Sequence, residues 1–206
     1  FCDKRGYILK SETSDFGAPD ERIHITRSSL DNFVNSLNTP FPLREYQYQC
    51  VGEAITRKRA ILLSPTGSGK SFIIYTLIRW YLENYNDKIL IIVPTTSLVE
   101  QMNSDFWEYG FDVDKEVHKI YSGKDKDTDK RVIVSTWQSI YKLPKVWFEQ
   151  FGAVFGDECH GFKSKSLMNI MNKATNAEFR FGTTGTLDGS QTHELVLQGL
   201  FGKVYR

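Results

Sequence analysis

The residues with the clearest chemical purpose form a short glycine-rich segment that directly follows the apolar run Ala60–Ser64 and precedes a helical pattern. The segment consists of Pro65, Thr66, Gly67, Ser68, Gly69, Lys70 and Ser71. Gly67 and Gly69 allow backbone N–H groups to curl around a phosphate, which a helix N-terminus also attracts. Lys70 would reach the β- and γ-phosphates, and the Ser71 hydroxyl would hold Mg²⁺. The segment therefore predicts a nucleoside triphosphate site, with Ser64 standing where the general pattern begins with glycine.

Two adjacent acidic residues follow a later apolar run. Asp157 and Glu158 come directly after Ala153–Gly156. A carboxylate at the end of a strand beside a phosphate loop can position Mg²⁺, and a second one can orient the water that attacks the γ-phosphorus. We therefore assign Asp157 to the metal and Glu158 to the water. The alternative is a surface Asp-Glu pair at the start of a helix, where acids also favour the helix dipole.

The elements that must position these residues alternate between buried strands and amphipathic helices. Such alternation is typical of βαβ units and a parallel sheet covered on both faces. Helices are predicted from about Gly69 and from about Ser97, the second ending at Gly110. The predicted strands are Ala60–Ser64, Lys88–Val93, Arg131–Ser135, Ala153–Gly156 and Phe179–Gly182. The expected fold is an α/β three-layer sandwich with a mostly parallel sheet.

Composition places the chain among ordinary globular proteins and excludes several classes. Hydrophobic residues make up 40% and charged residues 25% of the 206 residues, and the net charge is +1. This balance excludes a disordered or fibrous chain and neither demands nor forbids a nucleic-acid partner. No apolar run is long enough to span a membrane. The three cysteines are not spaced as a disulfide framework and the four histidines are not spaced as a zinc site, so we expect free thiols and no structural metal.

The N-terminal part of the chain differs from the rest. Residues 1–39 are polar and rich in turns, with one amphipathic helix that offers Leu30, Phe33, Val34 and Leu37. Such a piece buries little by itself, so we expect the tail of a small accessory domain and a linker at 1–39, docked on a domain at 40–206. The start without Met or a signal peptide indicates a fragment of a longer intracellular protein.

Six segments, in this order, resemble the first RecA-like domain of superfamily 2 DExH helicases and translocases, and in particular the DNA translocases of repair and of type I or III restriction. They are Leu43–Gln47, Pro65–Ser71, Val93–Gln101, Val134–Gln138, Asp157–His160 and Gly182–Thr186. The resemblance implies an ATP-dependent motor on DNA, with ATP and Mg²⁺ bound at the phosphate loop. It also implies a second RecA-like domain of the same protein, which would supply an arginine to the γ-phosphate, and a place inside the cell, in host cytoplasm if a phage encodes the protein.

The resemblance also implies a role for individual residues. Gln47 would contact the adenine edge with Arg44 packed nearby, and His160 would complete the catalytic group of Lys70, Asp157 and Glu158. Thr184, Gly185 and Thr186 would couple the nucleotide to the second domain, with Gly185 in place of the usual alanine. The residues implied to contact the phosphates of one DNA strand are Pro94, Thr95, Thr96, Ser122, Gly123, Thr136, Trp137 and Gln138.

Purely structural roles stay open for some of the predicted DNA contacts. Thr95 and Thr136 directly follow strands at the edge where open α/β sheets bind ligands, yet each would equally cap the next helix. Trp137 stacks on a base or packs in the interior, and packing is favoured. Two other functions share the phosphate loop: a small-molecule kinase, and a nucleotide-gated module that binds DNA and never hydrolyses ATP. Glu158 argues against the second, because only turnover needs a carboxylate to orient water.

Overall fold

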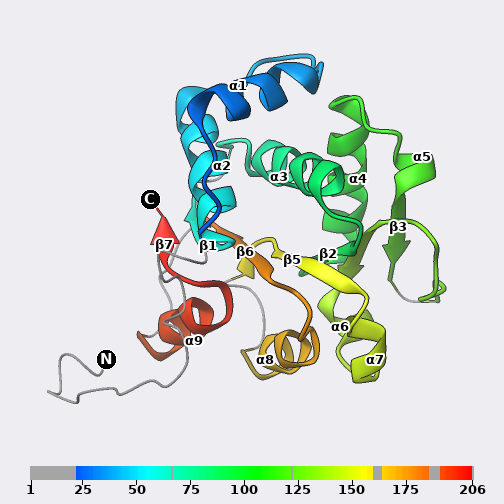
Figure 1. The fold of residues 1–206 in the computed structure, drawn as a ribbon. Coiled ribbons are helices and arrows are strands. Elements are labelled where there is room, and N and C mark those ends of the chain that lie inside the picture. Colours follow the sequence, from blue (N-terminus) through cyan, green and yellow to red (C-terminus); the bar gives the residue numbers. More distant parts are fainter. Residues whose placement is uncertain (1–21, 66, 122, 160–163, 186–190, 206) are drawn as a thin grey trace, which may run out of the picture.

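The computed structural model describes residues 22–65, 67–121, 123–159, 164–185 and 191–205. Its centre is one seven-stranded sheet of order β3-β4-β2-β5-β6-β1-β7 (Figure 1). The strands are β1 Arg59–Leu63, β2 Lys88–Val93, β3 Val117–Ile120, β4 Val132–Thr136, β5 Phe151–Gly156, β6 Phe179–Thr184 and β7 Val204–Tyr205. Every strand pair in the described part of the chain is parallel, so the sheet is parallel throughout rather than mostly so.

Helices cover both faces of the sheet, which gives three layers (Figure 1). One face carries α1 Arg27–Ser36, α2 Glu45–Arg57, α3 Lys70–Asn84, α4 Thr96–Glu108 and α5 Val113–Glu116. The other face carries α6 Trp137–Ile140, α7 Lys145–Phe148, α8 Ser164–Lys173 and α9 Gln191–Phe201. The layered α/β fold predicted from the sequence is therefore confirmed.

Side chains of the central strands alternate between two apolar cores. In β2, Ile89 and Ile91 lie in the core beneath α1–α4, whereas Leu90 and Ile92 lie in the core beneath α6–α9. Successive side chains of a strand point to opposite faces, so a strand buried on both faces is apolar throughout. The five predicted strands are the ones with such apolar runs.

The two outermost strands, β3 and β7, were not predicted because neither has a continuous apolar run. In β3, His118 and Lys119 are half-buried, and only Val117 and Ile120 are buried. Strand β7 consists of two half-buried residues next to β1. Partial exposure of an edge strand removes the apolar signature on which its prediction depends.

Helix α1 packs on the same core as α2 and α3. Leu30, Phe33 and Leu37 are buried in that core, which fits the amphipathic helix predicted there. The division of the chain at residue 40 stays a prediction. Among the described residues, no helix combines the length and apolar character that crossing a bilayer requires.

Candidate nucleotide site and strand tips

The phosphate loop connects the end of β1 to the start of α3. Gly67 and Gly69 have φ angles of +80° and +77°, in the region that side chains with a Cβ rarely adopt. A Cβ on Gly69 would lie 2.6 Å from Nε2 of Gln47, so Gly69 is needed for its conformation and for space. Thr66 lies outside the described residues. Both glycines therefore adopt backbone conformations that residues with a Cβ rarely take, and their contact with a phosphate stays a prediction.

Gln47 fastens the start of α2 to this loop. The side chain is 4% exposed; its Nε2 donates to the Ser68 carbonyl at 3.1 Å, and its Oε1 accepts from the Arg44 N–H at 2.9 Å. The Tyr46 hydroxyl also donates to the Ser68 carbonyl. The amide of Gln47 is thus engaged by backbone at both ends, and its contact with adenine stays a prediction.

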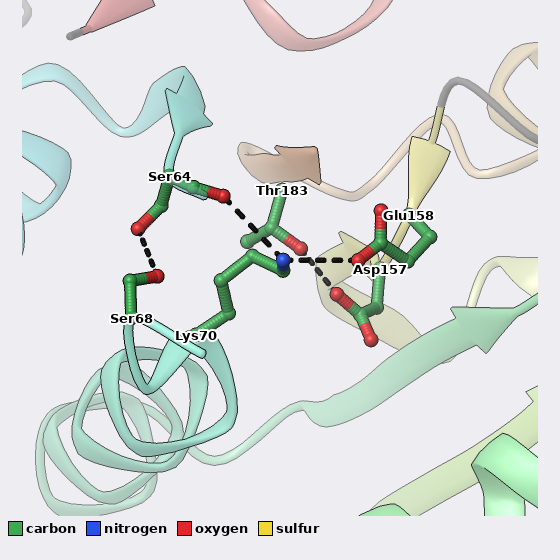
Figure 2. Close-up of polar contacts among 6 residues, drawn as sticks. All are labelled: Ser64, Ser68, Lys70, Asp157, Glu158 and Thr183. Atoms are coloured by element: carbon green, nitrogen blue, oxygen red, sulfur yellow. Dashed lines mark hydrogen bonds and ion pairs between the residues drawn. The ribbon is translucent and has the colours of Figure 1, made fainter. Parts of the chain in front are cut away.

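Ser64 closes the loop in the place where the general pattern has glycine. Its hydroxyl lies 2.5 Å from the Ser68 hydroxyl (Figure 2). Its N–H donates to the Thr184 carbonyl at 3.0 Å. The second bond joins the first residue of the loop to the last residue of β6. A serine therefore supports the turn through its side chain, where glycine would offer only flexibility.

Lys70 and Glu158 form an ion pair at the mouth of the loop. The Nζ of Lys70 lies 2.9 Å from Glu158 Oε1 and 3.4 Å from the Ser64 carbonyl oxygen (Figure 2). Glu158 has a φ of +48°, so the chain turns sharply directly after Asp157 and directs the two carboxylates differently. The two residues that sequence analysis placed on the phosphates and on the attacking water are thus in contact.

Asp157 lies deeper than Glu158, at the end of β5. It is 8% exposed, and its Oδ1 accepts a hydrogen bond of 2.5 Å from the Thr183 hydroxyl on β6 (Figure 2). Burial raises the pKa of Asp157 above its ordinary value, while the Thr183 bond and the Lys70 charge act in the opposite direction. A buried carboxylate beside a phosphate loop gains most from a cation, which compensates for its lost hydration.

The segment predicted to couple the nucleotide to the second domain begins at Thr184, but the hydrogen bond to Asp157 comes from Thr183, one residue earlier. Thr183 binds Asp157, whereas Thr184 is fully buried with its carbonyl bonded to Ser64. Gly185 follows β6, and both Thr186 and His160 lie outside the described residues. Nothing in the spacing alone distinguishes Thr183 from Thr184; the alternation of side chains along β6 decides it.

The residues assigned to magnesium provide oxygen donors only. Ser71 offers a hydroxyl, which lies 2.8 Å from the Tyr109 hydroxyl, and Asp157 offers a carboxylate. The described part of the chain has no cluster of three or more His, Cys, Asp or Glu residues that would cage a metal. Mg²⁺ typically takes one or two protein oxygens and completes its shell with water and phosphate, so this donor set fits it. No sequence signal indicated the bond between Tyr109 and Ser71.

A cavity of about 430 Å³ lies beside the loop and is large enough for a base and sugar. Of the residues assigned to the nucleotide, Arg44, Pro65, Gly67 and Ser68 line it. The other lining residues are Tyr46, Gln49, Cys50, Leu63, Ser64 and Tyr205. Cys50 lies four residues after Tyr46, so helical spacing could have found it. Tyr205 could not have been found, because only the pairing of β7 with β1 brings it there.

Six of the eight residues predicted to contact DNA lie at the ends of two neighbouring strands. We call these two segments the strand tips: 94–96 after β2 and 136–138 at the end of β4. Val93 and Thr136 are register partners, so the two tips lie side by side, and Gln138 Nε2 donates to the Pro94 carbonyl at 3.2 Å. Thr95 also caps α4, because its hydroxyl accepts from the Leu98 N–H at 3.4 Å. Thr95 therefore caps α4 and also lies at the ligand-binding edge of the sheet, so the two alternatives do not exclude each other.

The remaining predicted DNA contacts have mixed surroundings. Thr136 precedes α6 without a side-chain capping bond; its hydroxyl lies 2.9 Å from the Ser139 hydroxyl. Trp137 is half-buried against the second core, with its ring 5.8 Å from that of Tyr141, as the packing interpretation favoured. Thr96 is the first residue of α4, and Gly123 has a φ of +79° in the segment after β3, whereas Ser122 lies outside the described residues. Contact of these residues with DNA stays a prediction.

Comparison with known proteins finds one matching family and two relatives named as a DNA helicase and a DNA translocase. The family described as type III restriction enzyme, res subunit, matches residues 40–189. The ATP-dependent DNA helicase uvsW of Enterobacteria phage T4 is 37% identical over 100% of this chain and 42% of its own length. The DNA 3'-5' translocase XPB2 of Sulfurisphaera tokodaii is 29% identical over 80% of this chain and 37% of its own length. The chain thus spans less than half the length of these curated relatives.

Solved helicase structures also resemble this chain. The crystal structure of the UvsW helicase from bacteriophage T4 matches with a TM-score of 0.86 and 38% identity, over 99% of this chain and 74% of that chain. The Hef helicase domain of Pyrococcus furiosus matches with a TM-score of 0.68 at 22% identity, which shows the fold alone.

Proposed function

The chain belongs to the family described as type III restriction enzyme, res subunit, and to the first domains of superfamily 2 helicases, and on that premise we propose that it is the ATP-binding motor domain of a DNA helicase or translocase. ATP hydrolysis would drive movement on branched or duplex DNA in recombination or repair, inside the cell. The observation that carries this proposal is the Lys70–Glu158 contact of 2.9 Å, made between the phosphate loop and the acid pair.

The proposed hydrolysis depends on a change of partner for Lys70. A triphosphate carries more negative charge than one carboxylate, so its oxygens would replace Glu158 as the partner of the Lys70 ammonium. Glu158, released from Lys70, would accept a hydrogen bond from the attacking water and orient it towards the γ-phosphorus. The loop amides at Gly67 and Gly69 would hold the phosphates during this exchange.

Mg²⁺ would be held by Ser71 and Asp157 and would neutralise charge on the β- and γ-phosphates. Burial makes the Asp157 carboxylate costly without a counter-charge, which supports its assignment to the metal. The Thr183 bond fixes the orientation of that carboxylate.

DNA would lie across the strand tips. Contacts from the backbone and from threonine hydroxyls would bind phosphates without reading sequence. A second RecA-like domain of the same protein would supply the arginine that such reactions use, a contribution worth roughly 10³–10⁵ in rate. Residues 1–39 would belong to an accessory domain and residues 40–206 to the motor.

The test is Glu158→Gln in the full-length protein. We expect ATP turnover to fall by roughly 10²–10⁴, the usual worth of a positioned acid or base. ATP affinity should be kept or increased, because the neutral amide no longer competes for Lys70. Glu149→Gln is the matched control, because Glu149 also pairs with a lysine, at 3.6 Å from Lys145, but lies away from the loop.

Two outcomes would contradict the proposal. Unchanged turnover in Glu158→Gln would remove Glu158 from the reaction. Turnover that DNA does not stimulate in the wild-type protein would favour the small-molecule kinase over the motor.

A further inference from the structure

A second cavity lies at the opposite end of β1 from the phosphate loop. Its volume is about 270 Å³, and its described lining residues are Arg22, Arg57, Arg59, Gln198, Gly199, Gly202 and Lys203. Arg59 begins β1, whereas the phosphate loop follows the end of β1. A strand of five residues spans roughly 17 Å, so this cavity is well separated from the nucleotide site and from the strand tips.

The cavity concentrates positive charge in a chain whose net charge is only +1. Three arginines and one lysine line it, and no Asp or Glu is among its described lining residues. These four residues come from three segments far apart in the sequence, around residues 22, 57–59 and 203, so the fold brings them together. Clustered cations in a concave surface focus the field and raise the local concentration of anions.

Two of the three arginines are fixed by hydrogen bonds. The Nε–H of Arg57 donates to Glu53 at 2.7 Å one helical turn earlier on α2, an ion pair that partly offsets the Arg57 charge, and the Nε–H of Arg59 donates to the Glu178 carbonyl at 3.1 Å. Such contacts fix the planes of both guanidinium groups, which lowers the entropy lost when an anion binds.

The glycines keep this surface open. Gly202 has a φ of +100°, and a Cβ there would lie 2.8 Å from the Arg59 carbonyl oxygen, so no other residue fits without a shift. Gly199 likewise presents no side chain to the cavity it lines. Backbone, four cationic side chains and Gln198 therefore form the described walls.

We propose that this cavity binds a backbone phosphate of DNA, as a second contact separate from the strand tips. Arginine forks match the geometry of phosphate oxygens. None of the described lining residues is aromatic, so a base would find no ring on which to stack, and the sugar-phosphate backbone is favoured over a free nucleotide. The inference rests on the proposed DNA-dependent function, and it extends the DNA path to the amino ends of β1 and β7, where a second arm of a branched substrate would lie.

The test compares two double variants of the full-length protein. Arg22→Gln with Lys203→Gln removes two exposed charges from the cavity. Lys115→Gln with Lys142→Gln removes two exposed charges elsewhere and serves as the control. Binding of a fluorescently labelled forked DNA is measured by anisotropy across a salt series without nucleotide, and ATP turnover without DNA reports that each variant is folded.

We expect the slope of log affinity against log salt to become shallower by about 0.9 in the cavity variant, which corresponds to one lost phosphate contact on B-form DNA. Affinity near 0.1 M salt should fall up to roughly tenfold. The control variant should retain the wild-type slope.

An unchanged slope in the cavity variant, or an equal change in the control, would overturn the inference. So would loss of binding of a fluorescent ATP analogue with DNA affinity retained, because it would assign the cavity to a free nucleotide. Failure of the proposed function is a separate result, namely wild-type ATP turnover that DNA does not stimulate, and it leaves the salt slopes readable.

Discussion

Gly69 offers a sharp test of how the phosphate loop is built, when Gly69→Ala is compared with Gly67→Ala. Both glycines have left-handed φ angles, near +80°, so alanine at either position costs about 1–2 kcal/mol in backbone strain. They differ in their surroundings. A Cβ at Gly67 has no neighbour within 4 Å, whereas a Cβ at Gly69 lies 2.6 Å from Gln47 Nε2.

Gln47 can move aside only by giving up its hydrogen bonds to the backbone at Ser68 and Arg44. Each such bond contributes about 0.5–1.5 kcal/mol. We therefore expect Gly69→Ala to lower the free energy of unfolding by about 2–5 kcal/mol and Gly67→Ala by about 1–2 kcal/mol. Urea unfolding followed by circular dichroism measures both values.

A double-mutant cycle with Gln47→Ala isolates the contact. In that background the alanine at position 69 no longer meets the glutamine, so its cost should fall to that of Gly67→Ala. Equal costs for the two glycine variants in the wild-type background would refute the reasoning, as would a cost of Gly69→Ala that Gln47→Ala leaves unchanged.

Two further substitutions test the acid pair and its neighbours. Asp157→Asn should raise the melting temperature at pH 7 while abolishing turnover. Burial raises the pKa of the Asp157 carboxyl above its ordinary 3.8, so as pH rises the unfolded chain loses the carboxyl proton before the folded chain does. The stability of the wild-type protein therefore falls as pH rises above 3.8. The stability gap between this variant and the wild type should therefore widen from pH 3.5 to pH 7, and a gap independent of pH would contradict the assignment. Tyr109→Phe removes the hydroxyl that contacts Ser71 and keeps the ring against Phe72, so Mg²⁺-dependent nucleotide affinity should fall while unfolding changes by only about 0.5–1.5 kcal/mol; an unchanged Mg²⁺ titration of nucleotide binding would contradict a role for Tyr109.

Local chemistry made part of the site readable in the sequence. The phosphate loop is contiguous, so the glycines, Lys70 and Ser71 are recognisable from residue type and order. The five inner strands are buried on both faces and are therefore apolar throughout, which marks them without any structure. The two acids stand at the end of one such strand, so their placement at the ligand-binding edge was predictable as well.

Contacts between distant segments were decided by the tertiary structure alone. The pairing of β5 with β6 brings Thr183 to Asp157, and the pairing of β1 with β7 brings Tyr205 to the nucleotide cavity and Lys203 to the cationic one. A hydrogen bond or a charge cluster between residues far apart in the chain leaves no periodicity in the sequence, because neither partner's type depends on its own neighbours. Local sequence therefore determined the phosphate loop and the layers of the fold, whereas strand order determined which side chains surround the acids and where the cations gather.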